Sequence, residues 1–218
     1  PQRYGYPIDS VDILFSPLLV DQDNNSLPEI YFSSDSLIYG SMIGGLSVGN
    51  FPFYVNDKVV TELSSADLNS DDNNELVFGT KNGLVSVLDH NGNQLFVYEQ
   101  SDSIIGFCSL SDVNNDSFFE IVFIATNDST SKLHIIDYLG NDLEGFPLII
   151  PKKIMAPAAI ADIDMDGYSD IVFGAIDGAV YVIDISGNIK AGFPVYALDD
   201  IYSPPTLLNL DDNPELEI

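Results

Sequence analysis

An acidic nine-residue motif that recurs five times along the chain limits the possible fold more than any other feature. Successive copies begin 46, 45, 50 and 47 residues apart. A fixed period of roughly 20–50 residues is typical of solenoids, propellers and other repeat proteins, so each copy marks one structural unit. We call the copies the first to fifth acidic loops: 21–29 (DQDNNSLPE), 67–75 (DLNSDDNNE), 112–120 (DVNNDSFFE), 162–170 (DIDMDGYSD) and 209–217 (NLDDNPELE).

The residues between the motifs predict short strands. Each of the first four motifs is followed at once by an apolar, β-branched or aromatic run, which is typical of a buried strand. A turn and a further apolar run come next, then a short segment around a Phe-Pro pair, and then small or apolar residues that lead into the next motif. With no helical periodicity, four strands per repeat are typical of one propeller blade. The Phe-Pro segments are 145–148 and 192–195, with looser versions at 50–53 and 5–8.

The sequence therefore predicts an all-β fold of four-stranded antiparallel blades, with four blades and the start of a fifth. We place the repeats at about 15–60, 61–105, 106–155, 156–202 and 203–218, and treat 1–218 as one partial propeller. An open arc of blades leaves apolar faces at its two ends. We therefore expect the chain to be a fragment of a larger ring, of seven blades.

The charge of the chain excludes one class of partner. Lys and Arg total 7 against 34 Asp and Glu, which gives a formal net charge of −27. Nucleic-acid binders neutralise phosphates with clustered Lys and Arg, and the sequence has no such cluster.

The five motifs hold 18 of the 34 acids, a concentration too local for a general solvating surface. Such crowded charge is expected to repel itself unless cations offset it. No run approaches the ~20 apolar residues of a membrane span.

Oxygen-bearing side chains recur at positions 1, 3, 5 and 9 of each motif. Alternate spacing in a curling loop aims successive side chains at one point, and a backbone carbonyl at position 7 can complete the set. Hard oxygen ligands in this number favour calcium over zinc or copper. The predicted ligands are Asp21, Asp23, Asn25, Leu27 and Glu29; Asp67, Asn69, Asp71, Asn73 and Glu75; Asp112, Asn114, Asp116, Phe118 and Glu120; Asp162, Asp164, Asp166, Tyr168 and Asp170; and Asn209, Asp211, Asn213, Glu215 and Glu217.

The loops are not equivalent. We rank the fourth loop first, because it combines four aspartates with Gly167 at position 6, where a tight calcium loop turns sharply. We rank the fifth last, because position 6 is Pro214. Asn supplies an oxygen without charge, so the Asn-rich loops are expected to bind more weakly. The alternative is that the loops are acidic turns that only satisfy their own backbones.

An EF-hand or dockerin loop shares the D-x-D-x-D-G spacing but needs a bidentate Glu at position 12 and a helix after it. Position 12 of the first four repeats is always phenylalanine, within a strand-like run. The helical alternative is therefore excluded. These residues are Phe32, Phe78, Phe123 and Phe173.

The repeats resemble the FG-GAP and VCBS family of calcium-binding propeller blades, which is related to the integrin α-subunit head, over nearly the whole chain. Phe78-Gly79 and Phe173-Gly174 match the Phe-Gly element of the family. Phe32-Ser33 and Phe123-Ile124 depart from it, and the Gly-Ala-Pro element is not evident, which favours a bacterial VCBS-like array. The resemblance implies up to one calcium ion per blade, in the hairpin between its first two strands, and a secreted or cell-surface protein.

The sequence contains no catalytic constellation. His90 and His134 have no matching partner in the other repeats, and no G-x-S-x-G, P-loop or histidine-metal motif is present. Repetition without a unique reactive set predicts a non-catalytic scaffold that mediates adhesion or binds a protein or glycan ligand. Similar blades also occur in lectins and in secreted carbohydrate-active enzymes such as polysaccharide lyases, and the fold alone does not choose between them.

Overall fold

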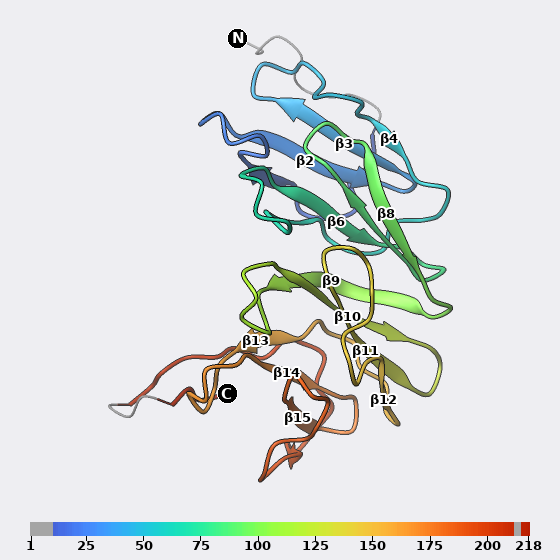
Figure 1. Cartoon of the computed structure of the whole chain (residues 1–218). Helices are drawn as coiled ribbons and strands as arrows, with labels where there is room; N and C mark the ends of the chain where they lie inside the picture. Colours follow the sequence, from blue (N-terminus) through green and yellow to red (C-terminus); the bar gives the residue numbers. More distant parts are fainter. Residues whose placement is uncertain (1–10, 212–214) are drawn as a thin grey trace. The chain divides into compact units, whose positions relative to one another are not determined.

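The computed structural model describes residues 11–211 and 215–218. These residues form sixteen strands and no helix, so no described segment is a helix able to cross a membrane. The strands make four sheets of four, and in each sheet neighbouring strands follow one another in sequence (Figure 1). This arrangement confirms the predicted all-β fold of four-stranded blades. The segment 5–8 lies outside the described residues.

The chain divides into two compact units at Cys108, within strand β9. The first two sheets belong to the first unit. They contain β1 (Leu18–Val20), β2 (Glu29–Ser34), β3 (Leu37–Met42) and β4 (Phe53–Tyr54), and then β5 (Ser64–Ala66), β6 (Glu75–Gly79), β7 (Leu84–Leu88) and β8 (Gln94–Glu99).

The other two sheets have the same plan. The third contains β9 (Ser103–Ser111), β10 (Glu120–Thr126), β11 (Ser131–Ile136) and β12 (Leu148–Ile150), and the fourth contains β13 (Ala159–Ala161), β14 (Asp170–Gly174), β15 (Ala179–Ile183) and β16 (Val195–Tyr196). The fourth strands β4, β12 and β16 start after the Phe-Pro pairs rather than on them.

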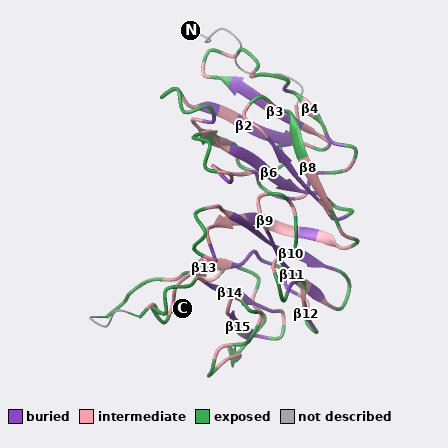
Figure 2. Cartoon of the chain, viewed as in Figure 1, coloured by how far each residue is buried: buried purple, intermediate pink, exposed green. Residues whose placement is uncertain are grey.

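The second strand of each sheet is its most buried element. Every residue of β6, β10 and β14 is buried, whereas the edge strand β8 is largely exposed or half-buried (Figure 2). Strands covered on both faces read as continuous apolar runs rather than alternating ones, which explains the run after each motif. The position-12 phenylalanines lie in these strands and are at most 3% exposed.

Each unit has its own apolar core. In the first unit, Tyr31 packs edge to face against Phe51, with ring centroids 5.2 Å apart, in a cluster that also holds Phe78. In the second unit, Phe173 stacks on Tyr181 at 5.3 Å within the corresponding cluster. Both clusters join residues of two successive sheets, so neighbouring blades within a unit are packed through their faces.

The Phe-Gly element has a steric cause. A Cβ built on Gly79 would lie 2.6 Å from Ile104 Cγ2, and one on Gly174 would lie 2.4 Å from Ile201 Cγ2. In these two blades a glycine thus allows the isoleucine of a following segment to approach the end of the second strand. Ser33 and Ile124 occupy the corresponding position in the other two blades.

Candidate functional site: the acidic hairpin loops

The first four acidic loops each join the first and second strands of a sheet, as the resemblance implies. The residue before each loop ends the first strand, and position 9 begins the second. These two strand ends face each other, as in the pairs Val20 with Glu29 and Ala66 with Glu75. Position 9 is therefore fixed by the sheet, while positions 1 to 8 form the hairpin connection.

Positions 4 and 6 curl each loop. Both have positive φ in all four loops, a conformation that residues other than glycine adopt infrequently. Only the fourth loop has glycine at position 6, yet Ser26, Asp72 and Ser117 reach φ values of 70°, 70° and 75° there. Glycine, which we ranked as the best residue for this turn, is therefore not needed there, because serine and aspartate adopt the same conformation.

Position 1 ties the loop to its own backbone. In the fourth loop, the two carboxylate oxygens of Asp162 accept hydrogen bonds from Asp166 N at 3.1 Å and Gly167 N at 3.0 Å. Asp21, Asp67 and Asp112 accept the same pair of bonds in the other three loops. This shared pattern closes each loop onto the carboxylate of its first residue.

Position 9 is a buried carboxylate in each of these four loops. Glu29, Glu75, Glu120 and Asp170 are at most 4% exposed, and one oxygen of each accepts the backbone N–H of position 2 at 2.9 to 3.2 Å. Burial raises the pKa of Glu75 and of Glu120 to about 7, with the nearby loop aspartates adding to the effect. These carboxylates carry a desolvation cost that a nearby cation would offset.

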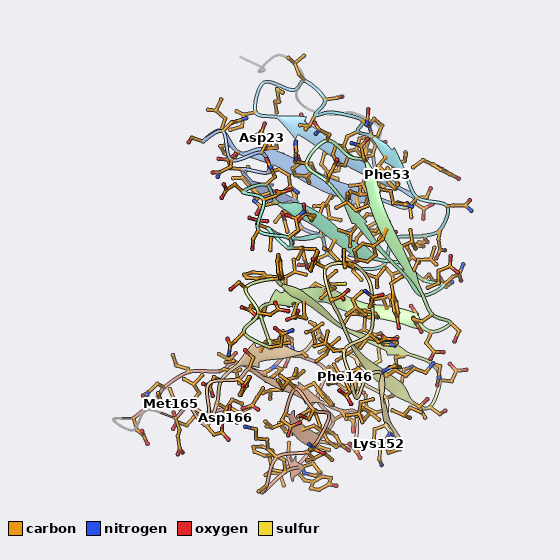
Figure 3. All side chains as sticks on the ribbon, viewed as in Figure 1. Asp23, Phe53, Phe146, Lys152, Met165 and Asp166 are labelled. Carbon is orange, nitrogen blue, oxygen red and sulfur yellow. The ribbon has the colours of Figure 1, made fainter. Side chains whose placement is uncertain are left out.

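The first loop provides a donor set that suits a metal ion. Asp21, Asp23 and Glu29 each offer an oxygen, and these oxygens lie within 4.8 Å of one another (Asp23 is labelled in Figure 3). Among residues 11–211 and 215–218, no lysine forms an ion pair with an acid of the first three loops. Hard oxygen donors without a protein counter-charge fit calcium.

The second and third loops have an amide at position 3. Asn69 Oδ1 is buried without a hydrogen-bond partner, while its Nδ2 lies 3.5 Å from Glu75 Oε1. An unpaired buried acceptor is costly, and a cation would satisfy it. In the third loop, Asn114 Nδ2 donates to Asp116 at 3.1 Å and to Glu120 at 3.2 Å, so this amide must turn before its oxygen can face an ion.

The fourth loop contains a cation of the protein itself. Lys190 Nζ lies 2.7 Å from Asp164 Oδ2, 3.2 Å from Asp166 Oδ2 and 3.0 Å from Asp170 Oδ1. Three of the four predicted acidic ligands of this loop are thus paired with one ammonium group. The sequence ranking of the loops did not consider this lysine.

The fifth loop is described only in part, because Asn213 lies outside the described residues. Glu217 accepts a hydrogen bond from Leu210 N at 2.7 Å, which repeats the bond between positions 9 and 2 of the other loops. Asn209, Asp211 and Glu215 are exposed.

A cavity adjoins the third loop. Its volume is about 710 Å³, and Asn114 of the loop lines it together with Glu144 and Ser186. These side chains offer both hydrogen-bond donors and acceptors to a ligand. Neither histidine lies in this lining, and His134 is instead buried in a stack with Phe123 at 4.6 Å.

Comparison with known proteins identifies the class of fold. No protein-family model and no curated protein matches the sequence. BBS1N, solved in complex with ARL6DN, is similar at 15% identity and a TM-score of 0.58, over 86% of this chain and 56% of that one. BamB from Moraxella catarrhalis is similar at 18% identity and a TM-score of 0.53, over 80% and 49%. The computationally designed Ika4 protein is similar at 20% identity and a TM-score of 0.51, over 77% and 88%.

These likenesses, together with the four sheets, define the chain as β-propeller blades. The chain spans about half the length of BBS1N and BamB.

Proposed function

We propose that this chain is a calcium-binding array of FG-GAP/VCBS-type propeller blades and part of a larger ring in an extracellular protein. In this proposal the array serves as a non-catalytic scaffold for a protein or glycan ligand. The observation that carries the proposal is the buried carboxylate at position 9, which recurs in each fully described loop with other acids gathered around it. A chain with 34 acidic and 7 basic residues has few side chains of its own to neutralise these clusters.

The donor chemistry supports calcium in the first three loops. The side-chain donors at positions 1, 3, 5 and 9 are carboxylate and amide oxygens, without histidine or cysteine. Such sets favour Ca²⁺, which takes six to eight oxygen ligands. Bound calcium would supply positive charge among these oxygens. Asp21, Asp23, Asn25 and Glu29 would hold it in the first loop, with the Leu27 carbonyl.

The scaffold role rests on the fold and on its repetition. Propellers present loops and cavities on a rigid frame, and the BBS1N structure is a complex of such a fold with the protein ARL6DN. The cavity beside the third loop is lined by polar side chains and by the apolar Leu143 and Ile185, and it gives this chain a concave surface of the kind that ligands use. Turnover of a polysaccharide panel by the purified chain would instead favour an enzyme.

Calcium titration by isothermal calorimetry, on protein freed of metal with chelator, tests the proposal. We expect the wild type to bind calcium with a Kd of about 10⁻⁵ M, within the range of oxygen-rich calcium loops. D23N should weaken binding at the first loop, because it removes one carboxylate from the cluster with Asp21 and Glu29.

The matched control is D35N, which makes the same charge change in the same blade. Asp35 is exposed, and its ion pair with Lys58, at 3.7 Å, lies on the surface. Such a pair contributes little to stability. Asparagine also tolerates the positive φ of this position. Equal calcium binding by D23N and D35N would contradict the assignment of the first loop.

A further inference from the structure

The ammonium group of Lys190 lies among three acids of the fourth loop. It contacts Asp164, Asp166 and Asp170 at 2.7 to 3.2 Å. The lysine side chain is only 17% exposed, whereas a long charged side chain usually extends into solvent. An ammonium has three N–H donors, so three carboxylate oxygens satisfy it completely. The contact is therefore a matched set of charge-assisted hydrogen bonds rather than a loose surface pair.

The remaining oxygens of these three aspartates are already used. Asp164 Oδ1 accepts from Asp166 N at 3.3 Å, Asp166 Oδ1 from Tyr168 N at 2.9 Å, and Asp170 Oδ2 from Ile163 N at 3.2 Å. Each carboxylate thus gives one oxygen to the loop backbone and the other to Lys190. A metal ion would have to take the same inward oxygens and displace the ammonium.

In the first and third blades, a backbone hydrogen bond identifies the residue that corresponds to Lys190, and that residue is not a lysine. Lys190 N donates to Val182 O of the third strand at 2.9 Å, just after an isolated bridge of Ile183 with Ile189. The same backbone bond is made by Val48 N to Gly40 O and by Leu143 N to Ile135 O. Valine and leucine provide no charge, so the first and third loops lack an equivalent cation at this position.

We propose that Lys190 Nζ takes the place of a calcium ion in the fourth loop, so that this loop is closed by a cation of the chain itself and binds no calcium. The contrast with metal-binding first to third loops rests on the proposed function, whereas the replacement itself rests on the contacts of Lys190. The fourth loop then stays ordered without metal. The loop that we ranked first for calcium from its sequence is thus the one that does not need the ion.

Two readouts on the whole chain test this inference. Native mass spectrometry counts the calcium ions bound, and hydrogen exchange in chelator follows residues 162–170. K190M keeps the apolar stem without the charge, and K190L copies Leu143 of the preceding blade. K152M is the matched control, because it removes a lysine that pairs with Asp177 at 2.8 Å outside the acidic loops.

We expect K190M and K190L to bind one calcium ion more than the wild type, and K152M to bind the same number as the wild type. In chelator, residues 162–170 should exchange faster in both Lys190 variants than in the wild type, and calcium should restore their protection. If a Lys190 variant unfolds in chelator, refolding on addition of calcium supports the inference, and failure to refold contradicts it.

The outcomes separate this inference from the proposed function. If the wild type binds no calcium, the proposed function fails, yet a calcium ion gained by K190M would still support the replacement. If calcium slows exchange of residues 162–170 in the wild type, or if the Lys190 variants gain no ion, the inference is overturned while calcium binding at other loops can stand.

Discussion

The side-chain carboxylate of Glu75 accepts a hydrogen bond from the backbone N–H of Leu68, seven residues earlier, at 2.9 Å. This bond joins the end of the second acidic loop to its beginning, and Glu120 makes the same bond to Val113 N at 3.0 Å. The hydrogen bonds that these glutamates accept do not compensate for burial, so the pKa of each rises to about 7. Below about pH 7, the metal-free second and third loops therefore each carry a position-9 carboxyl group that favours its protonated form.

The raised pKa values of Glu75 and Glu120 predict how the stability of the protein, freed of metal by a chelator, depends on pH. The folded pKa of about 7 lies above the ordinary value of 4.5, so the folded state binds more protons than the unfolded state between these values. The stability from protonated Glu75 and Glu120 is complete below about pH 4.5 and is lost as the pH rises through about 7. Urea unfolding in chelator should give a larger free energy of unfolding at pH 5 than at pH 7.5.

The double variant E75Q/E120Q is the control for this effect. General repulsion among the acids also weakens as the pH falls, but it is nearly unchanged in the variant. The difference in unfolding free energy between pH 5 and pH 7.5 should therefore shrink in E75Q/E120Q. An unchanged difference would show that these two buried glutamates do not titrate as the structure implies.

The close approach of Ile104 to Gly79 predicts that G79A destabilises the first unit. The added Cβ would meet Ile104 Cγ2 at 2.6 Å and Thr61 Cγ2 at 2.8 Å, in a buried region where neither side chain has room to move. Overpacking of a core typically costs about 1–3 kcal/mol, so we expect a loss of that size in chemical unfolding. G44A is the matched control, because a Cβ on Gly44 meets nothing within 4 Å. Equal stability of G79A and the wild type would contradict the packing described here.

The strand plan was predictable because each part of it is local in the sequence. The apolar runs after the motifs became β2, β6, β10 and β14, and phenylalanine at position 12 lies in each of them. The distance between motifs, together with turns between apolar runs, was enough to predict four-stranded blades, which the structure confirms. The fourth strands β4, β12 and β16 begin three residues later than predicted and end one or two residues later, because strand ends depend on pairing rather than on composition.

Other features depend on contacts between distant residues. Lys190 lies 20 residues after the end of the fourth loop, and the spacing within the loop contains no information about it. The sequence did contain one sign of this contact, since a lysine replaces the valine or leucine that other repeats have after the Gly turn. That the Lys190 side chain reaches Asp170 becomes clear only in the structure. The reason for Gly79 was equally hidden, because Ile104 belongs to the following sheet.

The dependence of thermal unfolding on calcium tests the central claim most directly. One site that binds only the folded state adds about 2.7 kcal/mol at a hundredfold excess of calcium over Kd, which for a chain of this size raises Tm by about 5–10 °C. We predict at least that increase when millimolar calcium replaces chelator, and no comparable increase with magnesium, which dehydrates reluctantly and demands stricter octahedral geometry. Superimposable melting curves in calcium and in chelator would show that the loops are acidic turns and would contradict the account.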